Sequence, residues 1–211
     1  MSAPRVVTFG EIMLRLSPPG VERLFQSPAL SATFGGGEAN VAVSLAHFGC
    51  DSVYVTRVPA HAVGDAAVRS LRAEGVDVTH VARGGTRLGI YFAETGASQR
   101  AAAVIYDRAH AAVADVTPGA FDWPRIFAGA RWFHLTGITP ALGAPVAAAA
   151  REAVDAARAA GLTVSLDLNY RAKLWTRQDA QQVMPALAAR CQVLIANEED
   201  LDASLGVPIV G

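Results

Sequence analysis

The chain has 211 residues and a formal net charge of −1; 52% of its residues are hydrophobic and 18% are charged. This composition excludes an intrinsically disordered chain, and the small net charge excludes the basic surface of a general nucleic-acid-binding protein. No apolar run reaches the roughly 18 residues that a membrane-spanning helix needs, and no signal-peptide core follows the first residues. We therefore expect a soluble, cytoplasmic, globular protein, with neither nucleic acid nor a membrane as a partner.

Short apolar runs typical of strands alternate along the chain with alanine-rich runs typical of helices. Strands are predicted at Val6–Phe9, Ser52–Val58, Gly89–Ala93, Ala103–Tyr106, Trp132–Leu135, Thr163–Leu168 and Val193–Ala196. Helices are predicted at 38–48, 62–74, 144–160, 178–189 and 198–205, and most of them end at a glycine. Repeated strand–helix–strand units build a mostly parallel sheet with helices on both faces, so the pattern predicts the α/β class.

Two segments depart from this alternation. Residues 12–35 and 86–108 contain short strand-like runs and turns but no helix, and the strands at 89–93 and 103–106 are expected to pair as a hairpin. We expect one domain over residues 1–211 with a β-rich appendage formed by these two segments. Such an appendage serves as a lid or as a surface for oligomerisation. The alternative is an ordinary extension of the main sheet's edge.

A run of three glycines, Gly35-Gly36-Gly37, precedes the helix predicted at 38–48. Glycine lets another chain or a ligand approach the backbone closely, and a helix start offers free N–H groups to an anion or a sugar hydroxyl. The dinucleotide-binding fingerprint requires a further glycine where Asn40 stands, and no Gly-Lys-Ser/Thr of a phosphate-binding loop follows. A ligand loop and a simple tight turn both stay open.

Polar residues follow three of the predicted strands. Tyr106-Asp107-Arg108 offers a guanidinium for a carboxylate or phosphate, but neighbouring Asp and Arg also form solvated surface pairs. The run 167–171 ends a buried strand, where open α/β sheets bind ligands, although a capping or ion-pair role is equally simple. The run 197–200 either binds Mg²⁺ through water or places acids at a helix N-terminus.

The cysteines and histidines form no metal or redox motif. Cys50 and Cys191 lie far apart in the sequence, and we expect both to be reduced. None of the five histidines has the spacing of a zinc site, and no nucleophile elbow of the α/β-hydrolases occurs.

Taken in order, these runs resemble the ribokinase-type (PfkB) carbohydrate kinases, and in particular their 2-keto-3-deoxygluconate kinase branch. The runs that carry the resemblance are Thr8-Phe9-Gly10-Glu11, Gly35-Gly36-Gly37-Glu38-Ala39-Asn40, Val63-Gly64-Asp65, Tyr106-Asp107-Arg108, Asp167-Leu168-Asn169-Tyr170-Arg171 with Leu174-Trp175, and Ile195-Ala196-Asn197-Glu198-Glu199-Asp200. The resemblance implies a Rossmann-type α/β fold with a β-sheet lid. It also implies transfer of the γ-phosphoryl group of ATP, with Mg²⁺, to a hydroxyl of a sugar acid.

The resemblance also assigns roles to individual residues. The implied sugar-binding residues are Gly36, Gly37, Asn40, Tyr91, Tyr106, Arg108 and Arg171. Those implied to bind the nucleotide are Asn169, Arg171 and Asn197, and those implied to hold the metal through water are Glu199 and Asp200. Arg108 is the expected partner of the substrate carboxylate, and Asp200 stands where the family's metal-handling element has Glu.

The family's catalytic base and nucleotide cradle lie in a Gly-Ala-Gly-Asp run that does not occur in this sequence. We therefore expect an amino-terminal two-thirds of the kinase architecture, with no catalytic residue of its own, little or no activity, and an uncovered apolar surface at strand 193–197. The alternative is a non-catalytic module that binds a sugar acid or dimerises through the lid. Fructose and 5-dehydro-2-deoxygluconate are the alternative substrates.

Overall fold

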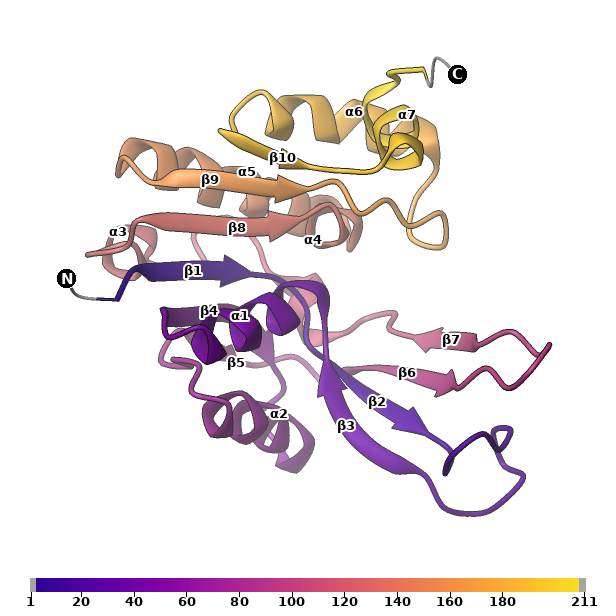
Figure 1. Cartoon of the computed structure of the whole chain (residues 1–211). Coiled ribbons are helices and arrows are strands. Elements are labelled where there is room, and N and C mark those ends of the chain that lie inside the picture. Colours follow the sequence, from indigo (N-terminus) through magenta and orange to yellow (C-terminus); the bar gives the residue numbers. More distant parts are fainter. Residues whose placement is uncertain (1–2, 209–211) are drawn as a thin grey trace.

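The computed structural model describes residues 3–208, which form a large and a small β-sheet with helices around the large one (Figure 1). The large sheet is parallel throughout, with the strand order β10-β9-β8-β1-β4-β5. Its strands are β1 (Arg5–Phe9), β4 (Asp51–Val58), β5 (Val81–Arg83), β8 (Trp132–Thr136), β9 (Thr163–Asp167) and β10 (Val193–Ile195). The predicted α/β class with a mostly parallel sheet is confirmed.

Helices cover both faces of this sheet. They are α1 (Gly37–His47), α2 (Ala62–Ala73), α3 (Trp123–Ile126), α4 (Ile138–Ala141), α5 (Ala144–Ala159), α6 (Arg177–Ala188) and α7 (Glu198–Leu205), with a single 3₁₀ turn, η1 (Ala112–Asp115). Because side chains alternate along a strand, Val53 and Val55 of β4 pack in the core under α3, α5 and α6, whereas Tyr54 packs under α1 and α2. No helix within residues 3–208 is both long and apolar enough to cross a membrane.

The small sheet has the order β3-β2-β6-β7 and extends away from the core on the side of α1 and β1 (Figure 1). Its strands are β2 (Met13–Ser17), β3 (Ser31–Gly35), β6 (Gly89–Glu94) and β7 (Ala103–Asp107). β6 and β7 pair antiparallel with Tyr91 opposite Tyr106, which confirms the predicted hairpin. Since these strands form a sheet of their own, they do not extend the edge of the main sheet, and that alternative was wrong.

The structure adds short elements that the sequence pattern did not predict. β5 has three residues and α3 and α4 have four each, so none is long enough to show a periodic pattern. Helix α6 begins at Arg177, directly after the capping Thr176, so its start lies one residue before the predicted one. The Thr176 hydroxyl accepts a hydrogen bond from the N–H of Asp179.

Strand β10 lies at the edge of the large sheet and pairs only with β9 among the residues that the structure describes. Leu194 and Ile195 on it are 41% and 49% exposed. An exposed apolar edge strand pairs readily with other chains, so we expect the isolated chain to self-associate as its concentration rises. Sedimentation velocity of the parent and of Leu194→Lys should show less association in the variant.

The matched control is Val63→Lys, which replaces an exposed apolar residue on helix α2 instead of a strand edge. It should leave the association unchanged. A parent chain that stays monomeric at high concentration and melts in one sharp transition contradicts this expectation.

His134 is buried on β8, and burial lowers its pKa from 6.5 to about 4. Its Nδ1 lies 2.8 Å from the hydroxyl oxygen of Ser165, which also accepts the indole N–H of Trp132 at 2.7 Å. Between pH 6.5 and 4 the unfolded chain binds a proton at this residue that the folded chain excludes. The free energy of unfolding therefore falls as the pH falls, by about 2 kcal/mol at pH 5 from this residue.

Urea unfolding at pH 7 and pH 5 measures this loss in the parent and in His134→Asn, which keeps an acceptor for Ser165 but does not titrate. We expect the free energy of unfolding to fall by about 2 kcal/mol more in the parent than in the variant between pH 7 and pH 5. Equal losses in the two chains would show that His134 does not control the acid side of the stability profile.

Candidate functional site

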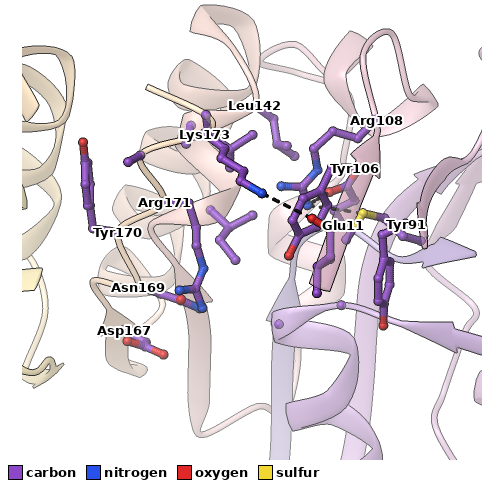
Figure 2. A pocket seen from close by; sticks show the side chains of 18 of the residues that line it. Glu11, Tyr91, Tyr106, Arg108, Leu142, Asp167, Asn169, Tyr170, Arg171 and Lys173 are labelled. Carbon is purple, nitrogen blue, oxygen red and sulfur yellow. Dashed lines mark hydrogen bonds and ion pairs between the residues drawn. The ribbon is translucent and has the colours of Figure 1, made fainter. Parts of the chain in front are cut away.

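A cavity of about 1530 Å³ lies where the small sheet faces the carboxyl ends of the large sheet's strands (Figure 2). Its core side comes from the residues that follow β1, β8, β9 and β10, including Glu11 and Ile138. Its other side comes from the small sheet and the chain leaving β7. Open parallel sheets bind ligands at this end, because the connections after the strands carry side chains that are not needed for the core.

The structure brings every sequence-predicted site residue to this one cavity. The residues concerned are Gly36, Gly37, Asn40, Tyr91, Tyr106, Arg108, Asn169, Arg171, Asn197, Glu199 and Asp200. They come from both sheets and from the first and last parts of the chain. Their individual roles stay predictions, but the convergence explains why polar runs follow several different strands.

Arg108 does not stand free in this cavity. Its guanidinium forms an ion pair with Glu11, which follows β1 and is only 2% exposed. The neighbouring Asp107 pairs with Arg87 at 2.8 Å instead of with Arg108. The solvated surface pair of Asp107 and Arg108 that the sequence left open therefore does not form.

Glu11 is held in an apolar setting, and burial raises its pKa to about 7 although Arg108 acts in the opposite direction. One of its carboxylate oxygens has no hydrogen-bond partner. The ion pair joins the chain entering the small sheet to the chain leaving it. It therefore fixes Arg108 at the base of that sheet, facing the cavity.

Two aromatic rings of the small sheet line the cavity next to this pair. The rings of Tyr91 and Tyr106 are 5.9 Å apart between centroids, and the guanidinium carbon of Arg108 lies 5.0 Å from the centre of the Tyr106 ring. Figure 2 shows both tyrosines beside Glu11 and Arg108. Tyrosines of this kind offer a flat apolar surface and a hydroxyl, which suits a polyhydroxylated ligand.

The glycine run forms the start of helix α1 at the cavity wall. Gly36 is the residue before the helix, and no side chain caps the first N–H groups of α1. A Cβ at Gly36 would overlap the carbonyl oxygen of Glu11, so the close crossing of these two segments requires glycine. The structure thus shows a close backbone crossing at the glycine run, and the ligand role of the run stays a prediction.

Helix α1 is anchored beneath the cavity by Glu38, which is fully buried. One of its oxygens accepts three hydrogen bonds: from the N–H of Thr136 at 2.9 Å, from the hydroxyl of Thr136 at 2.9 Å and from the hydroxyl of Thr139 at 2.6 Å. Burial raises the pKa of Glu38. This carboxyl group ties α1 to β8 and α4, and so holds the glycine run against the large sheet.

The far end of the cavity carries the acids and amides that follow β9 and β10. Asn169 takes a left-handed backbone conformation with φ of 38°. The side chain of Asn197 caps helix α7 by accepting a hydrogen bond from the N–H of Asp200 at 2.7 Å. A carboxylate oxygen of Asp200 accepts a hydrogen bond from the backbone N–H of Tyr170, with 3.1 Å between the nitrogen and the oxygen. Burial and the carboxylate of Asp200 raise the pKa of Asp167.

These groups fit a hydrated magnesium ion better than a directly bound one. Carboxylate oxygens are the ligands that Mg²⁺ prefers, and Mg²⁺ usually retains several of its waters. A cation between Asp167 and Asp200 would relieve the repulsion that raises the pKa of Asp167. No group of three or more His, Cys, Asp or Glu side chains within residues 3–208 is arranged to hold a metal ion directly.

Sequence reasoning missed two residues of this cavity, Glu11 and Lys173. Glu11 stands directly after the first strand, where its position among the carboxyl ends of parallel strands is a usable signal. Lys173 lies in the loop after β9 and contacts the small sheet, and no local spacing in the sequence indicates that contact.

A parallel sheet whose carboxyl ends face a smaller sheet across a ligand-sized cavity defines this protein as one with a ribokinase-like fold. Residues 3–210 match the model of the pfkB family carbohydrate kinases. The chain belongs to the pfkB family, which confirms the predicted resemblance.

Known relatives support the same assignment. A curated 2-dehydro-3-deoxygalactonokinase of Haloferax volcanii is 39% identical over 202 residues, which are 95% of this chain and 63% of that protein. The crystal structure of 2-dehydro-3-deoxygluconokinase from Thermotoga maritima superposes with a TM-score of 0.96 at 52% identity, over 99% of this chain and 64% of that one. The chain thus spans slightly less than two thirds of these relatives.

Proposed function

We propose that this chain supplies the sugar-binding part of a cytoplasmic, ATP-dependent kinase that phosphorylates a sugar acid, 2-keto-3-deoxygluconate, to its 6-phosphate. The observation that carries the proposal is the single cavity that gathers Arg108, Tyr91 and Tyr106 at one end and Asn169, Arg171 and Asn197 at the other. The first group suits a carboxylate and a sugar ring. The second suits phosphate groups and a hydrated cation.

The roles of this chain's own residues follow from that division. The open N-terminus of α1 at Gly36 and Gly37 donates hydrogen bonds to sugar hydroxyls, with Asn40 beside them. Arg108, fixed by Glu11, binds the carboxylate and so orients the sugar, while the small sheet acts as a lid that excludes water. Phosphoryl transfer depends on such positioning and on stabilisation of charge.

At the other end, Asn169 and Arg171 bind the phosphate groups of ATP, and Asn197, Glu199 and Asp200 hold Mg²⁺ through water. When bound, Mg²⁺ neutralises part of the charge on the phosphates. The general base is expected in the Gly-Ala-Gly-Asp run that this sequence lacks. The 211 residues alone therefore bind the sugar acid but turn over little or none of it.

The test compares two proteins in a phosphoryl-transfer assay with ATP and Mg²⁺. One is the 211-residue chain, and the other is the same chain joined to the remaining third of the Thermotoga maritima relative. We expect 6-phosphorylated product from 2-keto-3-deoxygluconate with the extended protein only. If the extended protein phosphorylates neither this acid, nor 5-dehydro-2-deoxygluconate, nor fructose, the proposed activity is wrong.

A second candidate is a non-catalytic module that binds a sugar acid and dimerises through the small sheet. It is favoured by β7, whose residues are all exposed and include Val104, Ile105 and Tyr106. If this candidate is right, the chain binds the acid. It also forms a dimer, which the Ile105→Lys substitution disrupts. Product formation by the extended protein would decide against it.

A further inference from the structure

Lys173 connects the two sides of the cavity. It lies in the loop between β9 and α6, and its Nζ donates a hydrogen bond to the carbonyl oxygen of Val104 in β7 at 3.3 Å. Within residues 3–208, this is the one hydrogen bond between the chain from β9 onward and the small sheet. Figure 2 shows the side chain extending toward Tyr106. Lys173 therefore lies at the opening of the cavity, where a bound sugar meets the lid.

The charge of Lys173 differs from that of Arg108. Arg108 is paired with the buried carboxyl group of Glu11, which offsets part of its positive charge. Lys173 forms no ion pair with a carboxylate among the described residues, although it lines the same cavity. Its ammonium group lies 5.6 Å from the centre of the Tyr106 ring, which Arg108 also contacts. Two cations thus share one ring at the acceptor end, and only Arg108 is paired with a carboxyl group.

The composition of the chain draws attention to the same residue. Lys173 is the only lysine in the sequence, and the other 17 of its 18 lysines and arginines are arginines. An ammonium group is a compact, strongly hydrated charge on a flexible stem, whereas a guanidinium is a planar fork. Lys173 is therefore the only side chain of this sequence that can bring an ammonium group to the cavity.

We propose that Lys173 determines the specificity of the acceptor site by binding the carboxylate of the sugar acid beside Arg108. This inference rests on the proposed function, because it presupposes an acidic sugar in the cavity. The uncompensated ammonium group attracts the acid and holds it against Tyr106, and its flexible stem lets it leave the carbonyl of Val104 to do so. A neutral sugar gains nothing from this charge.

The first test is calorimetric titration of the 211-residue chain with 2-keto-3-deoxygluconate and with fructose. Lys173→Met removes the charge but keeps an apolar stem of similar length, and Lys173→Arg keeps the charge. We expect Lys173→Met to weaken binding of the acid by about tenfold or more, on the scale of a charge-assisted hydrogen bond. Binding of fructose should change less than twofold, and Lys173→Arg should recover most of the affinity for the acid.

The second test needs no variant. An amine-reactive acylating reagent can label only Nζ of Lys173 and the amino terminus, because the chain has no other lysine. Mass spectrometry separates these two sites. We expect the acid to protect Lys173 from labelling, and fructose at equal occupancy to protect it less, while labelling of the amino terminus stays constant as the internal control.

The outcomes separate this inference from the proposed function. If the parent binds the acid and Lys173→Met binds it equally well, Lys173 does not set specificity, and the proposed function stands. If Lys173→Met weakens binding of the acid and binding of fructose equally, Lys173 only holds the lid through the carbonyl of Val104. The inference is then overturned. If the parent binds no acid, the proposed function and this inference fall together.

Discussion

Replacing Arg108 with alanine is expected to weaken binding of 2-keto-3-deoxygluconate by about 1.5–3 kcal/mol, which is roughly tenfold to a hundredfold or more. Arg108 lines the cavity and stacks beside Tyr106, so its loss removes the charge-assisted hydrogen bonds to the carboxylate. It also leaves Glu11 buried without its partner. Titration calorimetry of parent and variant measures the change.

The control for this comparison is Arg125→Ala on the short helix α3, which lies outside the cavity. It should bind the acid as the parent does. The Arg108→Ala substitution should weaken binding of fructose much less than binding of the acid, because fructose has no carboxylate. If the variant binds acid and fructose with equally small losses, Arg108 serves only as the structural partner of Glu11.

Replacing Glu38 with alanine is expected to destabilise the fold by about 3 kcal/mol or more. One of its oxygens accepts all three hydrogen bonds that Thr136 and Thr139 direct to this site, and alanine would leave these donors buried with a cavity in place of their acceptor. Glu38→Gln keeps an oxygen for the three donors. It also resembles the protonated acid that burial favours.

Urea unfolding of the parent, Glu38→Ala and Glu38→Gln measures the effect. We expect Glu38→Gln to lower the free energy of unfolding by less than half as much as Glu38→Ala does. An alanine variant within about 1 kcal/mol of the parent would show that the threonine donors find other acceptors. In that case the buried carboxylate does not anchor α1.

Much of the fold follows from the sequence because its signals are local. The strands of the large sheet are short β-branched and apolar runs, and glycines such as Gly49 and Gly161 end the preceding helices in the left-handed conformation. The small sheet was indicated by the absence of helical periodicity at 12–35 and 86–108. Elements of three or four residues, such as β5, were missed because tertiary packing defines them.

The site residues were predictable as a group because parallel strands end at one edge of the sheet, so the polar runs after them converge. The contacts that these residues make with one another could not be predicted. The pairing of Arg108 with Glu11 joins residues far apart in the sequence, and the contact of Lys173 with Val104 crosses from core to lid. Such contacts depend on where the two sheets meet, which no local pattern records.

The measurement that tests the central claim most directly is calorimetric titration of the unmodified chain with 2-keto-3-deoxygluconate and, separately, with fructose. The claim is that the cavity between the two sheets selects a sugar acid through its positive charge. We expect saturable binding of the acid at millimolar concentration or below, with fructose bound at least about tenfold more weakly, on the scale of one charge-assisted hydrogen bond. No heat at millimolar acid, or fructose bound as tightly as the acid, would contradict it.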